Sequence, residues 1–450
     1  MKPTLRDYQE EDVEKLLTKN KTACFNEQRT GKTPTAITVM EKRNVNKLII
    51  ICPKSAIPVW TDEYNKWTGK EATPIQGSKN KKEELVKEWK NNAIILSYDA
   101  FKPTKNRNGF IDILLKKNPE GIIFDEAHRM KNRNSKNFEA AKRCNKIQYM
   151  LLLTGTPSAK PDDIWTLLHL LDPKRFSSYW RFVNEFLIAT KKYLKNKEFT
   201  DIIGIKPSAK PYLVKILNEY STNRKRKDVM QWLPEKTRIN VRLKGSDKQY
   251  KHLENLKEYW ETDNIITKGV LDRLIRYRQI CLDPRILGLK GTSAKTEWLL
   301  DYCEDYPDTP KIIFTKFTSY INILTQDLQK KKIPFASITG ATKTENRKKY
   351  IKDFQEGKFN TLILNIDAGK EALTVDRAEV TIFMDKYPPH TDIQQAEDRF
   401  VATTEDKANK DHLIYNLMIK DSYDEQIYRM LEKNASETDV INNYKKYIGM

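Results

Sequence analysis

Short runs of β-branched and other apolar residues recur along the first third of the chain, and longer polar stretches with helical spacing separate them. Four of these runs have the length and composition of buried strands, at 48–51, 93–96, 121–124 and 150–153. Strands that alternate with helical stretches are typical of a parallel sheet covered by helices. The pattern therefore predicts an α/β domain over residues 1–160.

The pattern changes in the middle of the chain. Residues 161–290 lack such runs and carry leucine and tryptophan at helical intervals, which predicts a helical insertion and linker. Strand-like runs return at 311–314, 361–364 and 380–384, and they predict a second α/β domain over 291–450 that ends in helices. We therefore expect the α/β class, with two parallel-sheet domains in tandem and a helical segment between them.

The composition is that of a folded protein with a strongly basic surface. Of the 450 residues, 8 are Trp, 21 are Tyr and 16 are Phe, which is too many aromatic residues for a disordered tail. Lysine and arginine outnumber aspartate and glutamate to give a formal net charge of +20. Polyanions are therefore the expected partners, and nucleic acid is the first of them.

Other protein classes do not fit the composition. The apolar runs are far shorter than the roughly 20 residues of a membrane-spanning helix. No apolar run follows the charges at the N-terminus, as a secretory signal would require. The 5 cysteines and 5 histidines are scattered, without the spacing of a disulfide framework or a metal site. We expect a monomeric protein of the host or bacterial cytoplasm, without a membrane partner, in which any metal arrives with a substrate.

Residues 26–33 have the context of a phosphate-binding loop. They read Asn-Glu-Gln-Arg-Thr-Gly-Lys-Thr, follow a short apolar patch and precede a helix-like stretch. Backbone amides and the helix N-terminus would cradle phosphates there. Lys32 would meet the β- and γ-phosphates, and the Thr33 hydroxyl would ligate Mg²⁺. A Gly-Lys-Thr triplet alone fits a surface turn equally well, so the loop needs a partner motif.

The partner motif is Asp-Glu-Ala-His at 125–128, directly after the predicted strand 121–124. A carboxylate at the carboxyl end of such a strand faces the nucleotide crevice of an open parallel sheet. Asp125 would hold Mg²⁺ through water, and Glu126 would polarise the attacking water. An acidic turn that only caps a helix is the alternative, but the loop lysine upstream favours the functional interpretation.

Further segments follow in a fixed order along the chain. They read Leu-Arg-Asp-Tyr-Gln at 5–9, Cys-Pro-Lys-Ser at 52–55, Leu-Thr-Gly-Thr-Pro at 153–157, Arg-Lys-Arg-Lys-Asp-Val at 224–229, Arg-Tyr-Arg-Gln-Ile-Cys at 276–281 and Gln-Ala-Glu-Asp-Arg at 395–399. With the two motifs above, the set resembles the superfamily 2 helicases, and within them the Swi/Snf-type translocases, over nearly the whole chain. The segment 52–55, followed by Trp60, Glu63 and Trp67, resembles the family's first DNA-contacting motif.

The resemblance implies two RecA-like domains that bind ATP between them and close and open with its hydrolysis, while DNA crosses both. It implies ATP with Mg²⁺ as cofactors, Mg²⁺ being held by Thr33 and Asp125. It assigns catalytic roles to Lys32, Asp125, Glu126 and Arg399. The nucleotide-binding residues that it implies, with Gln9 reading adenine, are Arg6, Gln9, Arg29, Thr30, Gly31, Lys32, Thr33 and Gln395.

The resemblance also implies contacts to DNA phosphates, which carry no sequence information. The implied contact residues are Lys54, Ser55, Arg129, Lys131, Thr154, Thr315, Thr339, Asn365 and Gly369. For the basic residues among them, a solvated face is the alternative. Basic clusters at 191–192, 224–227, 330–332 and 347–349 add a candidate phosphate track.

The chain departs from the family pattern in the last motif and in the loop. Ala402 stands where a second arginine is expected, three residues after Arg399. Arg399 would then supply the transition-state charge alone, unless it only pairs with the neighbouring carboxylate of Asp398 or Glu397. Arg377 and Lys370 are the next candidates for that charge. In the loop, Asn26 and Arg29 replace glycines.

Three functions remain open at this point. The first is an ATP-driven translocase on duplex or branched DNA that migrates forks or junctions in replication, recombination or repair, similar to phage-encoded branch-migration helicases. The second is a motor that displaces proteins such as a stalled polymerase from duplex DNA. The third, suggested by Ala402, is a DNA-binding relative that does not hydrolyse ATP. DNA-dependent ATP hydrolysis separates the third function from the other two.

Overall fold

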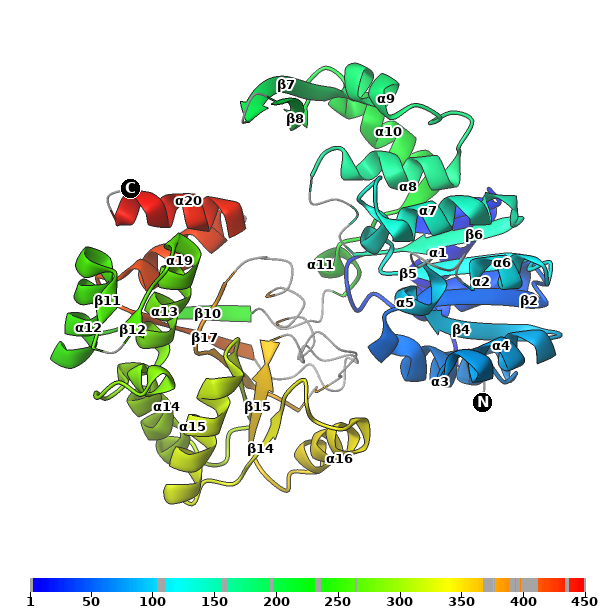
Figure 1. The fold of residues 1–450 in the computed structure, drawn as a ribbon. Coiled ribbons are helices and arrows are strands. Elements are labelled where there is room, and N and C mark those ends of the chain that lie inside the picture. Colours follow the sequence, from blue (N-terminus) through cyan, green and yellow to red (C-terminus); the bar gives the residue numbers. More distant parts are fainter. Residues whose placement is uncertain are drawn as a thin grey trace. The chain divides into compact units, whose positions relative to one another are not determined.

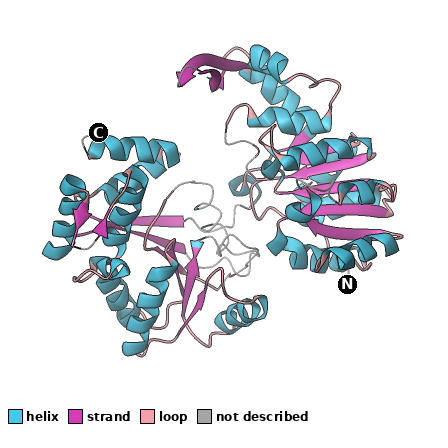
Figure 2. Cartoon of the chain, in the orientation of Figure 1, coloured by secondary structure: helices cyan, strands magenta, loops and turns pink. Residues whose placement is uncertain are grey.

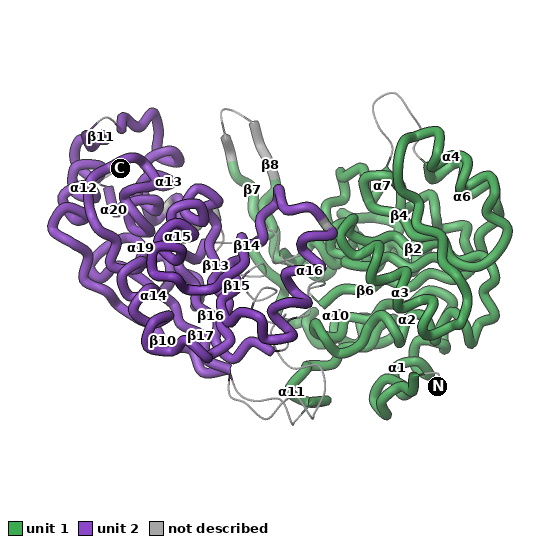
Figure 3. The backbone as a smooth tube through the Cα atoms, turned by 90° about the horizontal axis from the view of Figure 1, so that it is seen from below, with its two compact units in different colours: residues 1–231 green, residues 232–450 purple. Residues whose placement is uncertain are grey.

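The computed structural model describes residues 3–448 apart from 103–109, 156, 158–159, 195–196, 231–235, 264, 367–374, 376, 388–392, 394–396, 398–411 and 434–436. The chain forms two compact units, Met1–Gln231 and Trp232–Met450 (Figure 3). The segment expected as a helical insertion and linker, 161–290, is divided between them. Each unit is described by itself.

Unit 1 is built on a sheet of seven parallel strands (Figure 1). In spatial order they are β3 (Thr73–Pro74), β4 (Asn92–Ser97), β2 (Lys47–Cys52), β5 (Gly121–Asp125), β6 (Tyr149–Leu153), β1 (Lys21–Cys24) and β9 (Ser221–Thr222). The four strands predicted for the first domain are all present as β2, β4, β5 and β6. Their residues are almost wholly buried because the sheet is covered on both faces.

Helices cover this sheet on both sides (Figure 2). They are α1 (Asp7–Leu17), α2 (Lys32–Lys42), α3 (Ile57–Thr68), α4 (Lys79–Glu88), α5 (Tyr98–Phe101), α6 (Ile111–Leu115), α7 (Lys136–Arg143) and α8 (Asp163–Leu171), with short 3₁₀ turns η1 (Lys54–Ala56), η2 (Ala127–Met130) and η3 (Cys144–Lys146). Successive strand residues point to opposite faces. Ile50 therefore packs with α1, α2 and α3, whereas its neighbours Ile49 and Ile51 belong to the core on the other face.

The remainder of unit 1 is not wholly helical, and this corrects the prediction for 161–231. Helices α9 (Tyr179–Phe186), α10 (Lys210–Tyr220) and α11 (Arg226–Val229) are present, but β7 (Leu187–Leu194) and β8 (Lys197–Ile205) form an antiparallel hairpin. Both strands are rich in β-branched and aromatic residues, which favour strands. The hairpin pairs with no other strand in the part of the chain that the structure describes.

Unit 2 contains a second parallel sheet, of six strands. In spatial order they are β10 (Lys236–Leu243), β17 (His412–Ile419), β16 (Val380–Phe383), β13 (Lys311–Thr315), β15 (Thr361–Asn365) and β14 (Phe335–Ile338). The three predicted strands are present as β13, β15 and β16, and the predicted α/β class with two parallel-sheet domains is confirmed. Strand β10 lies inside the stretch expected to be helical; it is an edge strand whose exposed and half-buried side chains dilute the apolar signal.

The helices of unit 2 also cover both faces of its sheet. They are α12 (Asp247–Tyr259), α13 (Val270–Leu282), α14 (Ala294–Asp305), α15 (Thr318–Lys330), α16 (Thr344–Gln355), α19 (Tyr423–Glu432) and α20 (Glu437–Tyr447), with the turn η4 (Pro284–Leu287) and a small hairpin of β11 (Glu261–Thr262) and β12 (Ile265–Ile266). Within the described residues, no helix has the length and hydropathy needed to cross a membrane. All five cysteines are buried free thiols.

A buried histidine makes unit 2 sensitive to acid. His412 accepts from the Thr381 hydroxyl at Nε2 (2.9 Å) and donates from Nδ1 to the Ala378 carbonyl (3.2 Å). Burial, reinforced by the nearby Lys236 charge, lowers the pKa of His412 from 6.5 to about 4. The unfolded chain therefore takes up a proton between these two pH values that the folded chain does not.

We expect the free energy of unfolding of unit 2 to fall by about 3 kcal/mol from this group as the pH drops from 6.5 to 4. His412→Asn should remove that part of the pH dependence, because asparagine stays neutral. Hydrogen exchange of the β16 and β17 amides, corrected for the intrinsic effect of pH, measures it. An unchanged pH slope in His412→Asn would assign the acid sensitivity to other groups.

Candidate functional site

Three neighbouring strands of unit 1 end in one row. Cys24 of β1 and Asp125 of β5 both lie in register with Leu153 of β6, which runs between them. In parallel strands the carboxyl ends meet at one edge of the sheet, where ligands bind in open α/β folds. The loop 26–33, the carboxylates of Asp125 and Glu126, and Thr154 therefore gather at the same edge.

The predicted phosphate loop has a left-handed turn at its end. Gly31 has φ 75° and immediately precedes α2. The Tyr8 hydroxyl and Gln9 Nε2 both donate to the Thr30 carbonyl (3.1 Å each), and Gln9 Oε1 accepts from the Arg6 amide (2.9 Å). A Cβ atom on Gly31 would lie 1.9 Å from Gln9 Nε2. The structure thus brings the segment 5–9 against the loop, and the expected nucleotide residues at 6, 9 and 29–33 lie together.

The lysine of the loop points back across it. Lys32 Nζ donates to the backbone carbonyls of Asn26 and Glu27, at 2.9 Å each. Phosphate oxygens are stronger acceptors for an ammonium group than neutral carbonyls are, because the bond is charge-assisted. The loop therefore holds its cation next to the place where phosphates would lie.

Asn26, which replaces a glycine, has a structural role of its own. It is buried, and its Nδ2 donates to Asp12 Oδ2 (2.6 Å) while its Oδ1 accepts from the Arg224 amide (3.0 Å). Its backbone is not left-handed, so no glycine is required there. Arg224 completes the cluster through Nε to Asp12 Oδ1 (2.7 Å) and Nη2 to Glu11 Oε2 (2.8 Å). The chain after β9 is therefore bonded to the start of the loop.

This cluster corrects the expectation that Arg224 contributes to a phosphate track, because two carboxylates bind its guanidinium. Glu27 extends the contact: its amide donates to the Arg224 carbonyl (2.9 Å), and its carboxylate accepts from the Arg226 amide (2.8 Å). In the sequence, the only sign of this contact between the loop and the segment 224–226 was the asparagine at position 26 in place of the usual glycine.

Asp125 is held in place by donors from three elements. Trp60 Nε1 of α3 donates to Oδ2 (2.8 Å), the Glu126 amide donates to Oδ1 (3.0 Å), and the Tyr98 hydroxyl donates to the Asp125 carbonyl (2.8 Å). Loss of water around the carboxylate, with the Glu126 charge beside it, raises the pKa of Asp125 to about 6. Trp60 is 1% exposed, so it positions this carboxylate and does not contact DNA as part of the motif that follows 52–55.

Glu126 lies next in the chain on a left-handed backbone, with φ 51°. His128 Nδ1 is 3.2 Å from Glu126 Oε2 and 3.0 Å from the Thr154 hydroxyl. Backbone strain of this kind in a non-glycine residue occurs mostly at functional sites. Thr154 is fully buried, and this corrects its assignment as a phosphate contact: its hydroxyl ties β6 to the acidic motif.

Oxygen donors at this edge suit a hard divalent cation. Magnesium is usually held by one or two carboxylates together with substrate phosphates. The Asp125 carboxylate and the Thr33 hydroxyl supply such oxygens, and a cation would offset the cost of the desolvated Asp125 charge. No group of three or more His, Cys, Asp or Glu forms a separate metal cage within the described ranges. The residues therefore fit Mg²⁺ that arrives with a nucleotide.

Unit 2 places its expected contact residues near the carboxyl ends of its strands. Thr315 ends β13 and donates its hydroxyl to Asp385 Oδ1 (2.7 Å), while Asp385 Oδ2 pairs with Arg278 Nη2 (3.3 Å). Thr315 is fully buried, so it positions Asp385 rather than meeting a phosphate as expected. Asn365 ends β15, and its Nδ2 donates to the Lys316 carbonyl (2.9 Å).

Thr339 lies in the turn after β14 and is half-buried. Arg347 holds this turn through Nη2 to the Thr339 carbonyl and Nε to the Thr342 carbonyl, each 2.9 Å. The guanidinium that opens the basic cluster 347–349 is thus bonded within the turn. That cluster is therefore less free for phosphates than its sequence suggests.

The last motif is described only in part. Gly369, Lys370, Gln395, Arg399 and Ala402 lie outside the described residues. Glu397 is buried and pairs with Lys386 (3.0 Å) and Arg238 (2.7 Å); burial opposes its ionisation, but these two cations lower its pKa to about 2. Arg377, a candidate for the missing charge, donates to the Phe354 carbonyl (3.0 Å) and Asn360 Oδ1 (2.7 Å). Its guanidinium therefore stabilises the fold of unit 2 through these hydrogen bonds.

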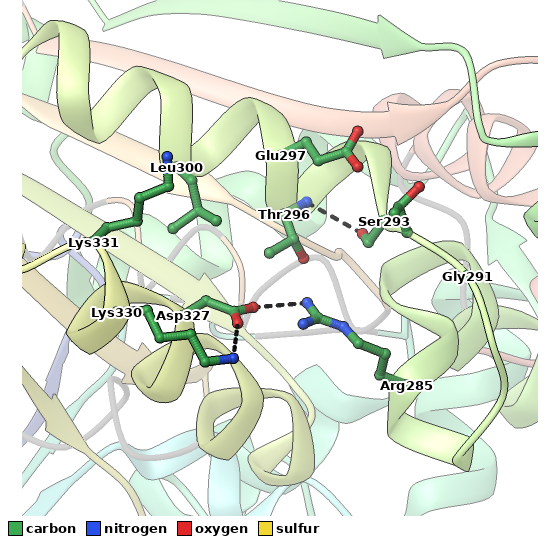
Figure 4. A pocket seen from close by; sticks show the side chains of 10 residues that line it. Arg285, Gly291, Ser293, Thr296, Glu297, Leu300, Asp327, Lys330 and Lys331 are labelled. Carbon is green, nitrogen blue, oxygen red and sulfur yellow. Dashed lines mark hydrogen bonds and ion pairs between the residues drawn. The ribbon is translucent and has the colours of Figure 1, made fainter.

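A cavity of about 500 Å³ in unit 2 lies away from these strand ends, beside α14 and α15. Arg285 at its wall bonds Asp327 Oδ2 (2.8 Å), and Lys330 also pairs with Asp327 (Figure 4). Arg285 pairs with Asp283 Oδ2 as well (2.7 Å). The Ser293 hydroxyl caps α14 by accepting from the Thr296 amide. Carboxylates neutralise the arginine, so we interpret the cavity as a packing feature of the helices.

Comparison with known proteins agrees with the geometry. The model of the SNF2-related domain matches residues 8–286, and that of the helicase conserved C-terminal domain matches 294–401. The "SWI/SNF chromatin-remodeling complex subunit snf22" of Schizosaccharomyces pombe is 25% identical over 443 residues, covering 88% of this chain and 26% of that protein. The "DNA annealing helicase and endonuclease ZRANB3" of Bos taurus is 23% identical over 419 residues, covering 89% of this chain and 37% of that protein.

The chain therefore spans between about a quarter and two fifths of the length of these two relatives. A solved structure, the "Sulfolobus solfataricus SWI2/SNF2 ATPase core in complex with dsDNA", aligns over 100% of this chain and 96% of its own, with 20% identity and a TM-score of 0.46.

Gly31→Ala should disrupt the loop through a steric collision and through backbone strain, and the control variant Gly69→Ala tests the strain alone. Its Cβ would collide with Gln9, and alanine is strained at φ 75°. Gly69 has φ 73° with no atom near its virtual Cβ, so Gly69→Ala carries the strain of about 1 kcal/mol without the collision. We expect Gly31→Ala to lower ATP turnover at least tenfold and Gly69→Ala to leave it within about twofold. Steady-state ATPase rates measure this, and equal rates in both variants would contradict the role of Gln9.

Proposed function

Because the chain belongs to the SNF2-related family and carries the family's ATP-dependent helicase core, we propose that it is a DNA motor that migrates forks or junctions in replication, recombination or repair. The single observation that carries this proposal is the row of strand ends at Cys24, Leu153 and Asp125. That row gathers a lysine loop and two carboxylates at one edge of a parallel sheet. The similarity to ZRANB3, which is named a DNA annealing helicase, supports an action on branched DNA.

The residues at this edge suit phosphoryl transfer to water. Lys32 supplies positive charge to the β- and γ-phosphates of ATP, and its present acceptors are only neutral carbonyls. Thr33 and Asp125 would hold Mg²⁺, which would neutralise charge on the phosphates. Glu126 orients and polarises the attacking water, while His128 fixes the Glu126 carboxylate at 3.2 Å. Arg399 supplies charge in the transition state, and Gln9, Arg6 and Gln395 hold the base and ribose side.

DNA contacts remain a proposal based on position and charge. In unit 1, Lys54 and Arg129 are exposed and Ser55 and Lys131 are partly exposed, all on turns that follow strands β2 and β5. In unit 2, Thr339 follows β14, and Asn365 is the buried last residue of β15. Gly369, which is also proposed as a contact, lies outside the described residues. A net charge of +20 favours a phosphate backbone as the ligand. The protein would act as a monomer in a reducing cytoplasm, where its five free thiols persist.

Two alternatives use the same core. A translocase that displaces bound proteins would need duplex DNA and gain nothing from a fork. A relative that binds DNA without hydrolysis is favoured by Ala402, which removes an arginine from the last motif. The similarity to phage-encoded branch-migration helicases stays a prediction.

The test is ATP hydrolysis with single-stranded, duplex, forked and four-way DNA compared side by side. We expect the forked and four-way DNA to stimulate hydrolysis most. Lys32→Ala and Glu126→Gln should lower it by about a hundredfold or more while DNA affinity changes little, because their partners are phosphate and water.

Matched controls carry the same substitutions at exposed positions of unit 1 without ion pairs in the described structure, Lys116→Ala and Glu88→Gln. Both should hydrolyse ATP like the parent. Hydrolysis stimulated equally by duplex and fork would favour the displacement motor. Absence of hydrolysis with every DNA would favour the non-hydrolysing relative, and near-normal rates in Lys32→Ala would contradict the site itself.

A further inference from the structure

Trp180 is the outer ring of an anchored aromatic cluster on unit 1. It lies in the first turn of α9, the helix that leads into the β7–β8 hairpin (Figure 1), and it is 49% exposed. Its ring centre is 5.1 Å from that of Tyr179, which in turn lies 5.4 Å from the buried Trp165. The Tyr179 hydroxyl donates to Asp162 Oδ2 (3.1 Å). The inner rings are thus fixed to the core, and the outer ring faces solvent.

A guanidinium group stacks on the same cluster. The Arg133 Cζ atom lies 4.0 Å from the Tyr179 ring centre and 5.5 Å from the Trp180 ring centre. Cation–π contacts of this kind immobilise both partners, so a ligand that stacks on them pays little ordering entropy. Single exposed aromatic residues are common on protein surfaces. This one differs because it is held from two sides.

Arg133 ends a group of cations that lack carboxylate partners. Among the described residues, Lys54, Arg129, Lys131 and Arg133 take part in no ion pair with a carboxylate. Arg129 stacks over Tyr98 (5.9 Å). Acidic groups near them have other partners: Asp99, which both Lys54 and Arg129 influence, pairs with Lys102 (2.6 Å), and Asp162 accepts from the Tyr179 hydroxyl. These side chains therefore keep their charge available for an external anion, and one of them, Arg133, lies beside an exposed aromatic ring.

We propose that Trp180 and Arg133 form a stacking site for an unpaired nucleobase, with Arg133 on the same segment as the proposed phosphate contacts Arg129 and Lys131. The inference rests on the proposed action on DNA and names the part of the substrate that this surface takes. Proteins hold single strands by combining basic residues along the backbone with aromatic rings under the bases. Bases inside a duplex are already stacked, so the site selects the first unpaired base at a fork or junction.

The experiment places 2-aminopurine, a base whose fluorescence is quenched by stacking, at the first unpaired position of a forked DNA. A second DNA carries it inside a blunt duplex. Binding is measured for the parent, Trp180→Ala, Trp180→Phe and a control, Tyr259→Ala, which removes another exposed aromatic ring, 67% exposed on α12 of unit 2. Thermal unfolding midpoints check that the variants fold.

We expect Trp180→Ala to weaken forked-DNA binding about five- to a hundredfold, the range for one stacked base, and to abolish the quenching. Blunt-duplex binding should change less than about twofold, Trp180→Phe should keep most of both signals, and Tyr259→Ala should match the parent.

Unchanged fork binding and quenching in Trp180→Ala would overturn the inference, as would an equal loss on fork and duplex. If DNA stimulates parental hydrolysis while Trp180→Ala binds forks normally, only the stacking site fails. If no DNA stimulates the parent, the proposed motor fails.

Discussion

Parallel pairing of β1, β6 and β5 fixes where chemistry can occur in unit 1. The register aligns Cys24, Leu153 and Asp125 across the three strands, so the chain leaves the sheet at one edge three times. A different group lies at the end of each strand: the lysine loop after β1, Thr154 after β6, and the carboxylates of Asp125 and Glu126 at the end of β5. Because the strands are buried on both faces, apolar packing holds this register. The register in turn determines where the polar groups after each strand lie.

The residues at this edge of the sheet have conformations and surroundings that lower the stability of the fold. Glu126 has a left-handed backbone although it is not a glycine, and desolvation raises the pKa of Asp125 to about 6. Such strain persists only where surrounding contacts determine it. Those contacts come from Trp60, which holds the Asp125 carboxylate, and from His128, which contacts the Glu126 carboxylate. A bound cation and phosphates would offset part of the cost, so the site is organised for ligands rather than for the stability of the empty fold.

Much of the fold could be predicted from the sequence, because buried parallel strands are nearly continuous apolar runs. The hairpin β7–β8 and the edge strand β10 were missed, since charged and polar residues interrupt their apolar positions and leave no long apolar run. The loop and the acidic motif were found because their residues are local in sequence. The bond from Asn26 to Arg224 joins residues 198 positions apart, and the burial of Thr154 and Thr315 depends on packing, so neither was visible.

The central claim is that the loop and the carboxylates form one ATP site. The most direct measurement is an experimental structure of the chain with Mg²⁺ and a non-hydrolysable ATP analogue. We predict that Lys32 Nζ leaves the carbonyls of Asn26 and Glu27 for a phosphate oxygen, and that Thr33 and Asp125 hold the Mg²⁺. A nucleotide bound elsewhere, with Lys32 still on those two carbonyls, would contradict it.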